Sequence, residues 1–188
     1  FHLYEWKNII EETYNHETFC NIVKDNGKIV GILPLTLMKN IILSKKLISS
    51  PFQNYGGPLA DNNFFINVLI NEIKNISNRF KINTCEIRNN PLREIELENL
   101  QTGKEKYMSS ILDLTLGNKK LWTNLNKKRR NSIRKSMSNS FRIIKGHSNI
   151  LLLHELYSNR MKELGTPSHS VHFFINIIKY LKNYCDIF

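Results

Sequence analysis

The sequence has few of the features that mark specialised classes of protein. Its 3 cysteines lie far apart and form no Cys-x-x-Cys or Cys/His spacing, so they predict neither a disulfide framework nor a structural zinc site. A reducing, cytoplasmic compartment is therefore the default expectation. No apolar run approaches the roughly 18–20 residues that a membrane helix needs, and the first residues carry no signal-peptide pattern.

Alanine is also nearly absent, whereas asparagine and isoleucine are abundant. Ala60 is the single alanine, beside 25 asparagines and 24 isoleucines. This skew is typical of an AT-rich coding bias, which also favours lysine. Part of the formal charge of +11 could therefore come from composition alone.

Acidic residues are missing from one long segment, and this absence localises the charge. Residues 1–113 carry 13 basic and 13 acidic side chains, whereas residues 114–154 carry 10 basic and no acidic ones. Almost the whole net charge thus lies in one segment. Such a field attracts phosphates, nucleic acid or anionic headgroups.

The first part of the chain predicts an α/β domain, because helical and strand periodicities alternate along it. Asn26-Gly27 is a strong hairpin signal, and Pro34 inside the second strand marks an edge or a bulge. Asp61 or Asn62 is the expected cap of a helix. The expected helices span 2–14 and 62–79, and the expected strands span 18–25, 28–38, 45–50, 83–88 and 107–116.

The second part predicts helices with little sheet. A basic helix is expected over 119–138 and a short strand over 141–145. Two further helices, 149–164 and 171–183, flank Gly165-Thr166-Pro167, because glycine stops the first and proline prevents its continuation. Both have apolar faces, so we expect them to be unusually exposed or to pack on the first domain.

Three motifs could carry chemistry, and the first is a loop from Gln53 to Pro58. It partly matches the Q/R-x-x-G-x-G/A loop with which GNAT acetyltransferases hold the pyrophosphate of coenzyme A. Pro58 removes one donor, and Asp61 would repel a phosphate. A tight turn, or a wall for a sugar or peptide made by Asn54 and Tyr55, is the other interpretation.

The second motif is the basic run over 127–135, which is either a solvated helical face or an anion-binding surface. No glutamate lies four residues away to offset the repulsion between its like charges. Arg129 falls on the apolar stripe from Leu125 to Ile133, so we expect its side chain to be held. These details favour anion recognition.

The third motif runs from Arg160 to Ser170 and contains His169, which could be a base, a hydrogen-bond donor or simply polar surface. His169 and His172 are three apart without an evident third ligand, so no metal site is predicted. There is no G-x-S-x-G motif, no context for a nucleophilic cysteine and no carboxylate pair that can be placed.

Taken together, these motifs resemble the FemAB family. The matching segments are Asn54-Tyr55-Gly56-Gly57-Pro58-Leu59, Arg130-Asn131-x-Ile133-Arg134-Lys135 and Leu164-Gly165-Thr166-Pro167-x-His169-Ser170-x-x-Phe173-Phe174. They occur in the family's order, and the most similar subgroup is the FemAB-like proteins associated with exosortase (PEP-CTERM) systems. The resemblance implies tandem GNAT-like domains, with a complete first domain over 1–117, a basic connecting helix over 118–140 and the opening of a second domain over 141–188.

The resemblance also implies an activity, which is acyl or aminoacyl transfer onto an amine in cell-wall, peptidoglycan or exopolysaccharide biosynthesis. FemAB proteins transfer an amino acid from aminoacyl-tRNA to a muropeptide amine. The implied substrate-binding residues are Asn54, Tyr55, Gly56, Gly57, Arg130, Arg134, Lys135, Arg160, Thr166 and His169. The basic helix would hold a phosphate-bearing substrate, either tRNA or a nucleotide- or diphosphate-linked acceptor, and no residue is assigned as the catalytic base.

Two other functions stay open. One is a coenzyme A-dependent GNAT N-acyltransferase, and the other is a non-enzymatic module that binds nucleic acid or an anionic membrane surface. We expect no permanently bound cofactor, because either acyl donor, aminoacyl-tRNA or acyl-CoA, would be a co-substrate. We also expect a cytoplasmic protein, peripheral at the inner membrane surface, that is longer than this chain at both ends and inactive as this piece alone.

Overall fold

The computed structural model describes most of the chain in two units. The described residues are 2–39, 45–89, 110–139 and 142–188. Contacts group residues 1–99 with 147–187 in a first unit, and residues 100–146 with Phe188 in a second. The predicted domain boundaries at residues 117 and 140 remain a prediction.

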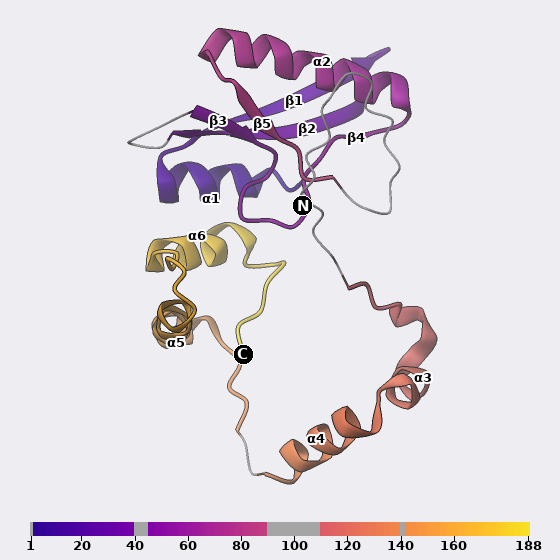
Figure 1. Cartoon of the computed structure of the whole chain (residues 1–188), viewed down its shortest axis with the longest axis vertical. Coiled ribbons are helices and arrows are strands. Elements are labelled where there is room, and N and C mark those ends of the chain that lie inside the picture. The colour runs from indigo at the N-terminus through magenta and orange to yellow at the C-terminus, as the bar shows by residue number, and fades with distance from the viewer. Residues whose placement is uncertain (1, 40–44, 90–109, 140–141) are drawn as a thin grey trace. The chain divides into compact units, whose positions relative to one another are not determined.

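The first unit is built on a mixed sheet (Figure 1). Its strands are β1 (Glu17–Asp25), β2 (Lys28–Lys39), β3 (Lys45–Ile48), β4 (Leu59–Ala60) and β5 (Thr84–Glu86). The order is β1-β2-β3-β5, with β4 also paired to β2, and only β3 and β5 pair in parallel. Asn26 and Gly27 have φ of 46° and 80°, so the tight turn between β1 and β2 has the expected positive φ at both positions.

Pro34 lies where β2 is paired on one side only, so it marks a local edge, as the sequence predicts, and not a bulge. It pairs with Cys20 of β1 in regular register, and the irregularity lies instead between Val23 and Lys24. On its other side, β2 pairs with β4 at residues 31–32 and with β3 at residues 36–39. Pro34 falls between these two partners, where its missing N–H costs no bond to either strand.

Helices cover both faces of the sheet (Figure 1). Helix α2 (Asn63–Phe80) packs on β1 and β2, where Leu33, Leu35 and Leu37 are at most 1% exposed. Helix α1 (Glu5–Tyr14) packs on the other face and fully buries two adjacent isoleucines, Ile9 and Ile10. As predicted, α2 has an asparagine cap, because the side chain of Asn62 accepts a bond from the Phe65 amide at 3.1 Å.

The last two helices join the first unit. Helix α6 (Val171–Leu181) packs along α1, and α5 (Ile150–Glu163) packs on α6. Lys179 bonds Glu12 at 2.8 Å, and the amide of Asn176 donates to the Thr13 hydroxyl at 3.0 Å. The leucines of α5 at positions 151, 152 and 156 remain 57–66% exposed. The prediction that these two helices are unusually exposed or pack on the first domain is therefore confirmed.

Gly165 ends α5, as the sequence predicts. It has a φ of 66°, and its N–H donates to the Lys162 carbonyl at 3.1 Å. The next amide, that of Thr166, donates to the Met161 carbonyl at 3.0 Å. These two bonds form a Schellman motif, which turns the chain sharply towards α6.

The second unit differs from three expectations. The single basic helix is two helices, α3 (Gly117–Asn124) and α4 (Lys127–Ser138), because the Asn126 side chain caps α4 by accepting from the Arg129 amide at 2.9 Å. The described part of the expected strand 107–116 has no strand, and residues 114–116 form a short 3₁₀ turn. Residues 142–145 are not a strand either, and residues 107–109 and 141 lie outside the described residues.

Docking of α6 on α1 can be tested at Phe173. Its side chain is 6% exposed and meets Trp6 edge-on at 5.9 Å, so Phe173→Ala should lower the free energy of unfolding by about 3–5 kcal/mol. The matched control is Ile175→Ala on the same helix, where the side chain is 41% exposed and the cost should be clearly smaller. Urea unfolding measures both, and equal costs would contradict the packing described here.

Candidate functional site

The Arg88 carbonyl group accepts two hydrogen bonds from the loop between Pro51 and Pro58. The amides of Gly56 and Gly57 both donate to the Arg88 carbonyl oxygen, at 2.9 and 2.8 Å. In GNAT acetyltransferases, the corresponding backbone amides donate hydrogen bonds to the pyrophosphate of coenzyme A. Because both amides of this loop already have an acceptor, the loop lacks the free pair of donors that the coenzyme A interpretation requires.

Arg88 ties the loop to the sheet through three further contacts. Its amide donates to the Ser49 hydroxyl at 2.7 Å, its Nε to Glu86 at 2.7 Å and its Nη1 to the Gln53 carbonyl at 2.9 Å. Partial burial works to raise the pKa of Glu86, but bonds from Lys46 and Arg88 outweigh it and lower that pKa. The carboxylate therefore stays charged and holds Arg88 in place.

An aromatic cluster forms where α1, this loop and α6 meet. The ring of Phe52 meets the imidazole of His169 edge-on, with 4.7 Å between the ring centroids. The ring of Phe173 stacks on the same imidazole, with 4.4 Å between the centroids. Tyr14 lies 4.9 Å from Phe52, and Tyr157 of α5 is parallel to the imidazole at 6.3 Å. We call these five residues the His169 cluster. It brings the first and third motifs of the sequence together.

Hydrogen bonds hold His169 from both ends of the residue. Its ring Nδ1 pairs with the Tyr14 hydroxyl, its backbone N–H points to the Tyr157 hydroxyl at 3.4 Å, and its carbonyl accepts from His154 Nε2 at 3.0 Å. Burial lowers the pKa of His169 below its ordinary value, and no carboxylate contacts the ring among the described residues. The imidazole is therefore neutral near pH 7.

The remaining predicted residues of the first unit take different places. Asn54 is exposed, Tyr55 is half-buried, and Thr166 is exposed at the end of α5. Arg160 is exposed as well, and its guanidinium pairs with Glu163 at 2.6 Å. The geometry joins His169 to the loop through Phe52.

On α4, Arg130 is held by neighbouring groups, whereas the sequence predicts this for Arg129. Arg129 is exposed, so the expectation that its side chain is held is wrong. Arg130 is held instead, because its Nη1 donates to the carbonyls of Thr123 and Leu125 at 2.9 and 2.7 Å, where α3 ends. Arg134 lies 5.4 Å from the Trp122 ring as a cation–π partner. Both therefore join α3 to α4.

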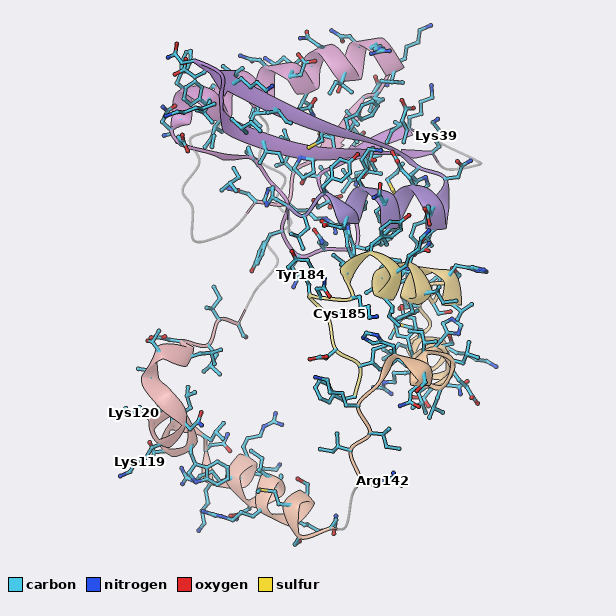
Figure 2. The ribbon with its side chains drawn as sticks, turned by 180° about the vertical axis from the view of Figure 1, so that it is seen from behind. Lys39, Lys119, Lys120, Arg142, Tyr184 and Cys185 are labelled. Carbon is cyan, nitrogen blue, oxygen red and sulfur yellow. The ribbon has the colours of Figure 1, made fainter. Side chains whose placement is uncertain are left out.

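A different face of α4 carries a shallow groove. The groove is lined by three lysines and two hydrogen-bonding side chains, which are Lys127, Lys128, Asn131, Ser132 and Lys135. Lys135 is the one predicted site residue on this face. Figure 2 shows further basic side chains in this unit, at Lys119 and Lys120 of α3 and at Arg142 beyond α4. We call the five groove residues the lysine face.

Sequence reasoning missed Tyr14 and Tyr157. Tyr14 ends the first amphipathic helix, where its polar tip could have marked it as more than core, but nothing local connects it with a histidine 155 positions away. Among the described residues, no cluster of His, Cys, Asp or Glu could hold a metal ion. No helix in the described part of the chain is long and apolar enough to cross a membrane.

Comparison with known proteins gives a fold. No family model matches the sequence, and no curated protein matches it. The solved structure of FemX superposes on 96% of this chain with a TM-score of 0.64, at 16% sequence identity. The chain spans 49% of the length of FemX. It therefore has the FemAB-like, GNAT-type mixed α/β fold that the sequence predicts, whereas the exosortase-associated subgroup receives no support from this comparison.

The packing of the loop can be tested at Gly56. A Cβ at this position would lie 2.2 Å from the Ser50 Cβ, so Gly56→Ala should cost about 1–3 kcal/mol in urea unfolding. Ser50→Gly supplies the control, because Ser50 has a φ of 44° that glycine adopts easily. In that background, Gly56→Ala should cost clearly less. The same cost in both backgrounds would show that the clash is not the cause.

Proposed function

We propose that the protein takes part in the transfer of an acyl or aminoacyl group onto an amine of a cell-wall or exopolysaccharide precursor. The observation that carries this proposal is the likeness to FemX over 96% of the chain. The three motifs that resemble those of FemAB proteins support it independently. Since the chain spans half of FemX, the activity belongs to the full-length protein.

In the proposed reaction, the acceptor amine attacks the carbonyl carbon of an activated ester. The protein's contribution is to position the two reactants and to stabilise the negative charge that develops on the carbonyl oxygen. The His169 cluster offers an aromatic surface with one polar ring atom, and Asn54 and Tyr55 on the adjoining loop would contact the acceptor. Thr166 lies shortly before His169 on the same connection and would line the same site.

The proposed acyl donor is an aminoacyl-tRNA. Two observations favour it over acyl-CoA: the bonds of Gly56 and Gly57 to the Arg88 carbonyl, and the second unit's excess of positive charge. The proposed cellular place is the cytoplasm, at the inner membrane surface where such precursors are assembled.

The lysine face is the proposed phosphate-binding surface. It presents only ammonium, amide and hydroxyl groups, which suits a polyphosphate or a nucleic-acid backbone. Arg130 and Arg134 are already engaged within the unit, so we assign the phosphate contacts to Lys127, Lys128 and Lys135. A non-enzymatic nucleic-acid-binding module is the second candidate function, because the same surface would serve it.

The transferase proposal is tested by incubating the full-length protein with a muropeptide amine. Aminoacyl-tRNA is supplied in one arm and acetyl-CoA in the other. Mass spectrometry should find a new amide of one aminoacyl residue in the first arm. An amide formed only from acetyl-CoA would favour the coenzyme A-dependent alternative. Binding of tRNA without any amide in either arm would favour the nucleic-acid-binding module.

The lysine face is tested by the salt dependence of tRNA binding. Each phosphate neutralised contributes a slope of about −0.7 to −0.9 in a plot of log affinity against log salt. The double variant Lys127→Gln with Lys128→Gln should therefore reduce the slope by about two such increments. Arg130→Gln is the contrasting variant, because it should loosen the junction of α3 and α4 without removing a phosphate contact. A slope unchanged by the double variant would show that the lysine face does not contact phosphates.

A further inference from the structure

The position of one proton in the His169 cluster follows from the partners of Tyr14. The Tyr14 hydroxyl has one hydrogen-bond partner among the described residues, which is Nδ1 of His169. Burial and the neighbouring Tyr157 raise the pKa of Tyr14 to about 12, so the phenol keeps its proton at neutral pH. Among the described residues, Nδ1 is the acceptor that lies within hydrogen-bond distance of that proton.

The surroundings of the ring leave it neutral and favour one tautomer. The polar groups nearby are Tyr14 at the end of α1, His16 stacked on Tyr14, and His154 and Tyr157 from α5, while Phe52 and Phe173 contribute only apolar surface. None of them is a carboxylate that could stabilise an imidazolium. A neutral ring that accepts at Nδ1 carries its hydrogen on Nε2.

The Nε2 atom is available to a ligand. It has no hydrogen-bond partner among the described residues. Among the described residues, Gln53 Oε1 is the one side-chain polar atom that is fully buried without a hydrogen-bond partner. Since Nε2 also lacks a partner but is not such an atom, it is accessible to solvent. A neutral Nε2–H is a hydrogen-bond donor and cannot take up a further proton at that atom. This property separates a role as donor from a role as base.

We propose that His169 donates a hydrogen bond from Nε2 to the carbonyl oxygen of the acyl donor, and that Tyr14 is the positioning residue that fixes this tautomer. The inference rests on the proposed acyl transfer and deepens it. It resolves the alternatives that the sequence left open for His169, because the ring acts as a donor and not as the base. The ligand group that it recognises is an ester carbonyl.

The reaction balances without a proton transfer to His169. The lone pair of the acceptor nitrogen forms the new C–N bond, and the carbonyl oxygen gains the negative charge, which the Nε2–H bond stabilises. When the carbonyl forms again, the bond between carbon and the ester oxygen breaks. The proton lost by the nitrogen ends on the departing oxygen, so an amide and an alcohol leave and His169 is unchanged.

The tautomer is tested by ¹⁵N NMR of the imidazole in the ¹⁵N-labelled full-length protein without substrate. We expect a protonated Nε2 and an unprotonated Nδ1 in the wild type. Tyr14→Phe removes the hydroxyl but keeps the ring, so the fraction of rings with the proton on Nδ1 should rise while the aromatic packing remains. A proton mainly on Nδ1 in the wild type, or a Tyr14→Phe variant with an unchanged ratio of the two tautomers, would overturn the proposal.

The role in transfer is tested with two substitutions at His169. Glutamine can donate from its own Nε2 but cannot act as a base, whereas alanine can do neither. His169→Ala should lower kcat by about 10²–10³-fold, and His169→Gln should recover a clear part of that loss. His172→Gln, at an exposed position on α6, is the control and should leave kcat unchanged.

The outcomes separate this inference from the function on which it rests. A wild-type protein that forms no amide from either donor contradicts the proposed acyl transfer, whatever the tautomer is. A wild type that is active while His169→Ala is equally active overturns only the donor role. Equal losses of kcat in the glutamine and alanine variants, with the wild type active, would also overturn it, because they would indicate that His169 acts as a base.

Discussion

The two-sided burial of α1 is the constraint on which the first unit depends. One side of this helix lies on the sheet, with Ile9 and Ile10 fully buried, and the other is covered by α6. A helix buried on both sides has few alternative positions, because a shift towards either neighbour opens a gap on the opposite side. Tyr14 lies at the end of α1, so the position of its hydroxyl is set by this packing. The geometry of the imidazole follows from it.

The loop beside α1 shows how the same unit prepares a surface in advance. The Arg88 carbonyl holds two consecutive amides, while the Arg88 side chain binds Glu86 and the Gln53 carbonyl. The loop is thus fastened before any ligand arrives, and a ligand at Phe52 would lose little affinity to ordering it. The second unit follows another principle. Arg130 and Arg134 bind within the unit, whereas the three lysines of the lysine face line a surface groove, which separates structural from ligand-directed charge on α4.

Local signals in the sequence predicted most of the elements of the first unit. The Asn26-Gly27 turn, the Asn62 cap and the Gly165 stop each act within a few residues, so pattern reasoning finds them. The break at Asn126 was missed, because in a polar, basic run a capping asparagine looks like one more surface residue. The site was predicted only in part. His169 and the loop were identified, but the contacts of His169 with Tyr14 and Phe52 depend on tertiary packing that no local period encodes.

The late position of α6 in the chain has a consequence for how the protein is made. The residues that cover the outer side of α1 follow it by about 163 positions, as the contact between Thr13 and Asn176 shows. A ribosome adds roughly 5–20 residues per second, so the nascent chain would carry that side of α1 uncovered for roughly 8–30 s. Closing so long a loop is also slow relative to local contacts. The His169 cluster can therefore form only after α5 and α6 have been synthesised.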